Sequence, residues 1–273
     1  MRHPALFAFA ALFAVAGCCG SLEADRSKLS LPKVDKAMDR VHAEIAARGD
    51  GRLYAGAAMI DITPAEARTD EGIYLGGFDL GRKSTGVRDP VYAHALYLDD
   101  GRAPFVIVSI DTIGYMRDDV LKVRELASDA FRDRIVVASV HDHVGPDTVG
   151  YWGSALGILP MCTGFKPEYK VTLQHQIAQA IDQAAAAARP ARVRAGTAMA
   201  PSDLSLNINA QIRDQKDDLV RVLSFDAEDG SPIAVVANWG CHAEAMWNDT
   251  LLSADWPGVF YDRWRKDVGG VPI

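Results

Sequence analysis

Apolar runs separated by breaks rich in glycine, aspartate and proline predict a chain of alternating strands and helices. Strands are expected at residues 55–62, 92–98, 105–110, 135–140, 192–199, 218–225 and 233–239. Helices, recognised by apolar residues three or four apart, are expected at residues 31–48, 120–131, 166–188 and 254–266. Such alternation is typical of an α/β or mixed α+β fold with a layered mixed β-sheet core and flanking helices.

The first 17 residues have the pattern of an export signal. A short basic start precedes an apolar run at residues 5–16, which is too short to cross a bilayer as a helix. The run ends in Val-Ala-Gly-Cys, which resembles a bacterial lipobox and predicts lipidation of Cys18. The alternative is an ordinary secretory signal cleaved near Ala16 or Gly20. Either signal predicts an exported protein of the bacterial cell envelope, lipid-anchored at the membrane surface or periplasmic or secreted.

Composition and charge restrict the class of protein. Of the 273 residues, 49% are apolar and 24% are charged, which is typical of an ordered globular chain. The net charge of −7 and the lack of a basic patch with interleaved aromatic residues argue against nucleic-acid binding. Residues 18–52 are expected to form a tether and an N-terminal helix, and residues 53–273 the core domain. Export permits a disulfide between Cys162 and Cys241, and a buried Cys241 thiol is the alternative.

Three histidines follow apolar strands. His141 and His143 come directly after the strand at 135–140, and alternation of side chains along a strand would point both the same way. His242 follows the strand at 233–239 in the same manner. Neutral imidazole is a common zinc ligand, so three histidines at two strand ends favour a metal site. The alternative is a set of polar loop residues.

Four further polar residues near these strand ends have less certain roles. Asp111 either orients a ligating histidine or caps a turn. Asp142 is expected to point away from its two histidine neighbours, so it is not predicted to be a ligand. Glu244 is interpreted as a solvated carboxylate, with a role as base or ligand as the alternative. Arg213 either binds an anionic or carbonyl oxygen or is a solvated charge.

An ordered set of segments resembles the neutral (non-lysosomal) ceramidase family. The matching segments span about residues 53–262 and occur in the order of that family. They are Gly56-Ala-Ala-Met-Ile-Asp-Ile-Thr-Pro64, Gly86-Val-Arg-Asp-Pro-Val91, Val108-Ser-Ile-Asp111, Ser139-Val-His-Asp-His-Val-Gly-Pro146, Asn238-Trp-Gly-Cys-His242 and Leu252-Ser-Ala-Asp-Trp-Pro-Gly258. The set is specific, whereas any one segment alone is not.

The resemblance implies a zinc-dependent amidohydrolase that cleaves ceramide, a lipid-like small-molecule substrate. By its motifs His141 and His242 correspond to zinc (Zn2+) ligands, and His143 to an active-site histidine near the substrate. Arg213 corresponds to an active-site arginine, although the residues beside it differ from the family pattern. Asp142 also departs from that pattern, so the chain resembles a distant bacterial member of the family. The remaining zinc ligands, a glutamate and a tyrosine, are expected beyond residue 273, so the domain is expected to be incomplete.

Two other functions fit the same sequence features. One is a non-catalytic envelope lipoprotein that keeps the fold to bind a ligand. The other is a metal-dependent hydrolase that acts on a different amide or on an ester.

Overall fold

A single large sheet dominates the protein. The structure, a computed structural model, describes residues 23–32, 37–129, 131–156, 159–207, 211–213 and 215–273. Eight strands form the sheet in the order β12-β10-β9-β8-β1-β3-β4-β5. Their bounds are β1 Tyr54–Asp61, β3 Tyr92–Asp99, β4 Phe105–Ile110, β5 Ile135–Ser139, β8 Arg189–Met199, β9 Leu219–Ala227, β10 Pro232–Asn238 and β12 Val271–Pro272. Neighbouring strands are antiparallel except β4 with β5 and β10 with β12, which are parallel.

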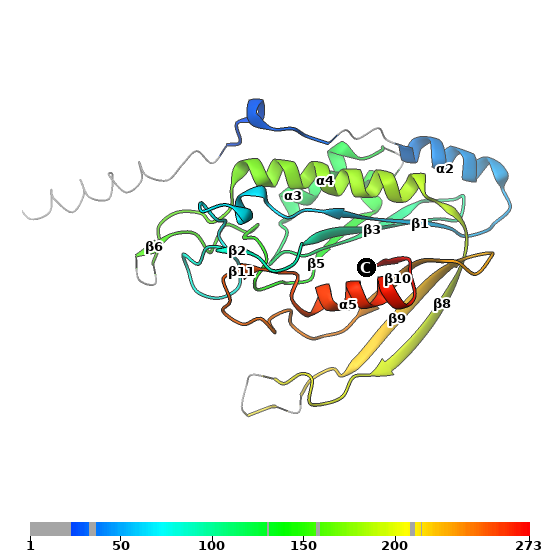
Figure 1. The fold of residues 1–273 in the computed structure, drawn as a ribbon. Helices are drawn as coiled ribbons and strands as arrows, with labels where there is room; N and C mark the ends of the chain where they lie inside the picture. The colour runs from blue at the N-terminus through cyan, green and yellow to red at the C-terminus, as the bar shows by residue number, and fades with distance from the viewer. Residues whose placement is uncertain (1–22, 33–36, 130, 157–158, 208–210, 214) are drawn as a thin grey trace, which may run out of the picture.

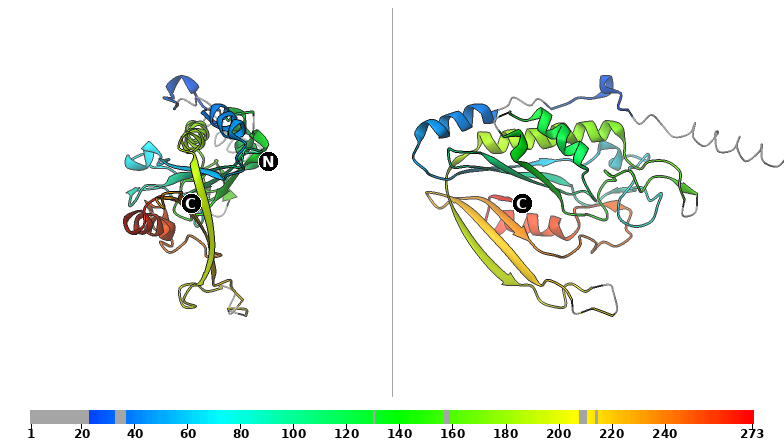
Figure 2. Two further views of the ribbon diagram at one scale, coloured as in Figure 1. Left: turned by 90° about the vertical axis from the view of Figure 1, so that its right-hand side faces the viewer. Right: turned by 180° about the vertical axis from the view of Figure 1, so that it is seen from behind.

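Helices cover both faces of the sheet, which confirms the predicted mixed, layered fold. The helices α2, α3 and α4 lie on one face and α5 lies on the other (Figures 1 and 2). Their bounds are α2 Ala37–Arg48, α3 Arg117–Leu126, α4 Pro167–Ala186 and α5 Asp255–Asp267. The shorter elements are η1 Arg26–Lys28, η2 Ala65–Arg68, η3 Arg132–Arg134, β2 Gly86–Val87, β6 Ala155–Leu156, β7 Leu159–Pro160 and β11 Leu251–Leu252. None of the described helices combines the length and apolar content needed to traverse a bilayer.

Helix α4 is held by packing rather than by capping. It begins with Pro167 and has no side-chain hydrogen bond at its N-cap. Leu173, Ile177 and Ile181 recur at four-residue spacing and are fully buried against the sheet in the main core. Each such side chain contributes about 1.5–3 kcal/mol when removed from water, more than the ~1 kcal/mol typical of an N-cap. The apolar stripe therefore fixes this helix on the sheet.

Several sequence predictions differ from the structure in detail. The helix expected at 120–131 ends at Leu126, where the Ala127 backbone turns to an extended conformation. Cys241 carries a free thiol, so the alternative of a disulfide between Cys162 and Cys241 is wrong. Burial raises the pKa of the Cys241 thiol. The export signal at 1–17 and lipidation at Cys18 lie outside the described residues.

Strand β1 approaches α4 closely at Gly56. A Cβ atom there would lie 2.1 Å from the Ala184 carbonyl oxygen and 2.7 Å from the Ala188 nitrogen. Both are backbone atoms, which cannot rotate away as a side chain can. Glycine is therefore required for the sheet to sit against the helix at this point.

The contact at Gly56 predicts a selective loss of stability. The Gly56→Ala substitution should lower the free energy of unfolding by about 1–3 kcal/mol or more, because the new methyl group displaces α4 backbone. Gly196 on β8 is the matched control, since nothing lies within 4 Å of a Cβ atom at that position. Urea unfolding of Gly56→Ala and Gly196→Ala measures both effects. Equal stability of the two variants would contradict the close contact.

Candidate metal centre

His141 and His143 lie in a turn beyond β5 and not on the strand. β5 ends at Ser139, and His141 has a left-handed backbone with φ of 63°. The expectation that strand alternation aligns the two side chains is therefore wrong, although the turn still brings their rings together. His141 Nδ1–H donates to the carbonyl oxygen of Ile113 at 2.7 Å. Because a carbonyl only accepts, the neutral His141 ring has its lone pair on Nε2.

The backbone of His143 is held on both sides. Its N–H donates to the Ala243 carbonyl oxygen at 3.0 Å, and its carbonyl oxygen accepts from Arg82 Nη2 at 2.5 Å. The buried Arg82 guanidinium also donates to the carbonyl oxygens of Gly76 and Asp249. The planar fork of arginine suits such convergent acceptors. Arg82 thus ties three loops together behind His143, a role that the sequence did not reveal.

The loop that carries His242 is held by the start of α5. The indole N–H of Trp256 donates to the His242 carbonyl oxygen at 2.9 Å. The carboxylate of Asp255 accepts from the N–H groups of Ala245 at 3.0 Å and Met246 at 2.8 Å. Asp255 is itself buried in a left-handed conformation with φ of 54°. A strained residue that makes several hydrogen bonds fixes the loop in one arrangement.

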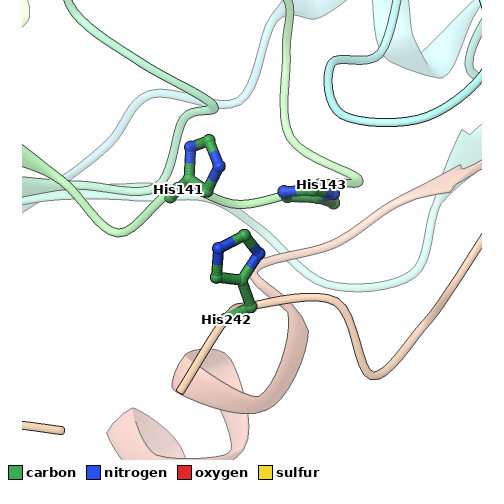
Figure 3. Close-up of side chains that lie close together, drawn as sticks. All are labelled: His141, His143 and His242. Atoms are coloured by element: carbon green, nitrogen blue, oxygen red, sulfur yellow. The ribbon is translucent and has the colours of Figure 1, made fainter. Parts of the chain in front are cut away.

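The three histidine rings meet at one point (Figure 3). The ring centroids of His141 lie 4.8 Å from those of His143 and of His242, and the latter two are 5.1 Å apart. One nitrogen from each ring lies within 4.8 Å of the others. Among the described residues, this is the set of three or more histidine, cysteine or carboxylate groups that could share a metal ion.

The chemistry of the cluster fits a cation such as zinc. Both ring nitrogens of His143 are buried and have no hydrogen-bond partner among the described residues. Burial foremost, and then the neighbouring His141, lowers the pKa of His143 to about 4. The ring is therefore neutral at neutral pH and offers a lone pair. The unpartnered ring nitrogens of His143 lie close to two other imidazoles, and imidazole nitrogens are typical zinc ligands.

Asp111 and Asp142 are not members of the converging group, and Arg213 lies in a different loop. Asp111 accepts from the Tyr92 N–H and the Tyr261 hydroxyl, both at 2.8 Å, so it neither orients a ligating histidine nor caps a turn. Asp142 is fully buried, and burial raises the pKa of its carboxyl well above the usual value. Arg213 is exposed in the loop between β8 and β9 and does not line the pocket described below.

Glu244 lies closer to the cluster than the sequence interpretation allowed. Its side chain is 28% exposed, and its Oε2 lies 3.5 Å from His143 Nδ1 and 3.6 Å from His242 Nδ1. The interpretation as a solvated carboxylate is therefore wrong. The sequence hint of this contact was that Glu244 lies two residues after His242. In a loop, however, such spacing does not predict where a side chain points.

A pocket of about 660 Å³ opens beside His242. Its walls include Trp239, Trp247 and Trp256, and His242 and Glu244 also line it. The Phe78 ring contacts His143 edge-on and Trp247 at a tilt, with 5.0 Å between ring centroids in each pair. Phe78 therefore connects the aromatic wall to the histidine cluster. Large apolar walls with a few polar groups are typical of small-molecule sites.

Comparison with solved structures identifies the fold. Neutral ceramidase from Pseudomonas aeruginosa superposes with a TM-score of 0.67 and 22% identity, over 82% of this chain and 38% of that chain. The chain has the neutral ceramidase fold. A ceramidase complexed with C2 matches equally well, with a TM-score of 0.67 and 23% identity, over 82% of this chain and 37% of that one. No family model matches the sequence, and neither does any curated protein.

The low pKa of His143 predicts how stability depends on pH. The folded ring has a pKa of about 4, below the ordinary value of 6.5, so the unfolded chain binds more protons between these values. Stability due to neutral His143 is thus complete above about pH 6.5 and is lost as the pH falls toward about 4. The His143→Asn variant should lose less free energy of unfolding than the native chain between about pH 7 and about pH 4.5.

Urea unfolding of both proteins in EDTA measures this difference without interference from metal binding. His175, on α4 and outside the cluster, provides the control variant His175→Asn. Parallel pH profiles for the native chain and His143→Asn would show that the fold does not hold His143 neutral.

Proposed function

We propose that this chain is a zinc-dependent amide hydrolase that cleaves the N-acyl amide of ceramide or of a related lipid amide. The observation that carries the proposal is the convergence of His141, His143 and His242 at one point of a neutral ceramidase fold. The chain spans 38% and 37% of the length of the two similar structures. The activity of those longer proteins is therefore assigned to this chain only as a proposal.

The three histidines would divide the work. His141 and His242 would hold the zinc ion. Bound there, zinc would supply Lewis-acid polarisation of the amide carbonyl. His143, whose ring is neutral and has free nitrogens, would donate a hydrogen bond to the developing oxyanion or move a proton to the leaving amine. Arg213 stays a candidate for binding the carbonyl oxygen.

The aromatic pocket supports a lipid-like substrate. Trp239, Trp247 and Trp256 offer large apolar surfaces directly beside His242. An acyl chain buried against them gains about 0.8 kcal/mol per methylene group removed from water. The amide of such a substrate would then lie beside His242, next to the other two histidines.

The proposal extends to the place of action. We propose that the chain is exported to the bacterial cell envelope and held at the membrane by a lipid on Cys18. A lipid substrate would then be available at the same surface, because an acylated protein stays at the membrane.

Two substitutions test the division of roles. The His141→Ala variant should lose bound zinc and turnover together, because a ligand is removed. The His143→Ala variant should keep zinc but lose turnover by about 10²–10⁴-fold, the usual contribution of a positioned proton donor or acceptor. Elemental analysis for zinc and release of fatty acid from a short-chain ceramide measure the two properties.

The His175→Ala variant is the matched control and should retain both properties, because His175 lies on α4 outside the cluster. Chelation should abolish turnover of the native protein, and added zinc should restore it. Bound zinc without hydrolysis of any N-acyl amide would favour the non-catalytic lipid-binding protein. Full turnover of His143→Ala would reject the role of that residue.

A further inference from the structure

The Glu244 carboxylate lies between two rings of the histidine cluster. Its Oε2 is 3.5 Å from His143 Nδ1 and 3.6 Å from His242 Nδ1. Those two imidazoles are the basic groups within 4.0 Å of it among the described residues. One oxygen atom thus faces the same ring position of two histidines that come from different loops.

His141 shows the same relation to a different oxygen. Its Nδ1–H donates to the Ile113 carbonyl oxygen, which leaves Nε2 with the lone pair. All three rings of the cluster therefore have an oxygen atom on the Nδ1 side. An acceptor on one ring nitrogen fixes the tautomer and the direction of the other.

We propose that Glu244 is a positioning residue, the shared acceptor for the Nδ1–H groups of His143 and His242. It holds both rings in the tautomer whose Nε2 lone pair is free, so His242 Nε2 is directed at the cation and His143 Nε2 at the substrate. Of the two roles proposed for His143, this tautomer selects proton transfer, because an unprotonated Nε2 accepts a proton and cannot donate a hydrogen bond to the oxyanion. The inference rests on the proposed function and adds a residue that works through the two histidines.

The geometry favours an orienting role over direct ligation. Glu244 is not in the group whose donor atoms converge within 4.8 Å, although its oxygen is near two members of that group. A carboxylate oxygen has room for two donors. The 3.5 and 3.6 Å separations are longer than a hydrogen bond, and such contacts tighten when an active site binds its ligands.

The backbone of Glu244 is already fixed. Its carbonyl oxygen accepts from the Trp247 N–H at 3.0 Å, and the next two N–H groups along the chain are held by Asp255. On the other side, the Ala243 carbonyl oxygen accepts the His143 N–H. The carboxylate thus projects from a rigid segment that also sets the separation of the two rings.

Zinc titration of the purified full chain tests the proposal. The Glu244→Ala variant should bind zinc about 10–100-fold more weakly than the native chain, the usual effect of losing an orienting carboxylate. Glu244→Gln, which keeps a neutral acceptor, should lie between the two. Glu125→Ala on α3 is the control, because that exposed glutamate pairs with Lys122 and should bind zinc as the native chain does.

Side-chain ¹⁵N NMR of the metal-free protein gives a readout that a merely structural residue would not move. His143 and His242 should show protonated Nδ1 and unprotonated Nε2 in the native chain, and a mixture of tautomers in Glu244→Ala. Thermal unfolding in EDTA checks that the variants fold. Native zinc affinity in Glu244→Ala, or protonated Nε2 in the native rings, overturns the inference alone. Failure of the native chain to bind zinc overturns the proposed function as well.

Discussion

One backbone hydrogen bond, from the His143 N–H to the Ala243 carbonyl oxygen, joins the two loops that supply the histidine cluster. The first loop follows β5 at one edge of the sheet, and the second follows β10 near the other edge. Strands separated so widely in the sheet order do not bring their ends together by pairing alone. The cluster forms because these two loops come together and are joined by this hydrogen bond.

Side chains that bind backbone groups hold this junction. Arg82 donates hydrogen bonds to carbonyl oxygens of three loops, including that of His143. Asp255 accepts hydrogen bonds from N–H groups of the segment after His242. Both side chains are buried, so their charges lie where an unpaired ion would be costly. Hydrogen bonds from these side chains to several backbone groups offset part of that cost and favour one arrangement of the loops. His141 and Asp255 have positive φ angles, which are strained for residues other than glycine. The surrounding hydrogen bonds stabilise the loops despite this strain.

The elements of the fold follow from patterns that the sequence displays openly. Apolar runs predicted the strands, and four-residue spacing predicted α4, because both depend on burial of neighbouring residues. The strand ends also placed His141, His143 and His242 near one another in outline. Their rings come together through turn geometry that no periodicity encodes, since the His141 backbone is left-handed and its ring bonds to the carbonyl oxygen of Ile113 in the loop after β4.

The partners of polar residues were harder to predict for the same reason. Asp111 follows an apolar strand like the histidines, yet its acceptors are used by Tyr92 and Tyr261. Glu244 is a charged residue in a loop, which suggests a solvated side chain. Only the fold brings His143 close to its carboxylate. Sequence alone gives the type of chemistry at a strand end, while the contacts of a loop decide which residue takes part.

The most direct test of the account is a crystal structure of the zinc-loaded protein with anomalous data collected at the zinc edge. The account predicts one strong peak inside the histidine cluster, about 2.0–2.1 Å from a ring nitrogen of His141 and from one of His242, with His143 facing it. A cluster without a peak, or zinc bound only elsewhere on the chain, would contradict it.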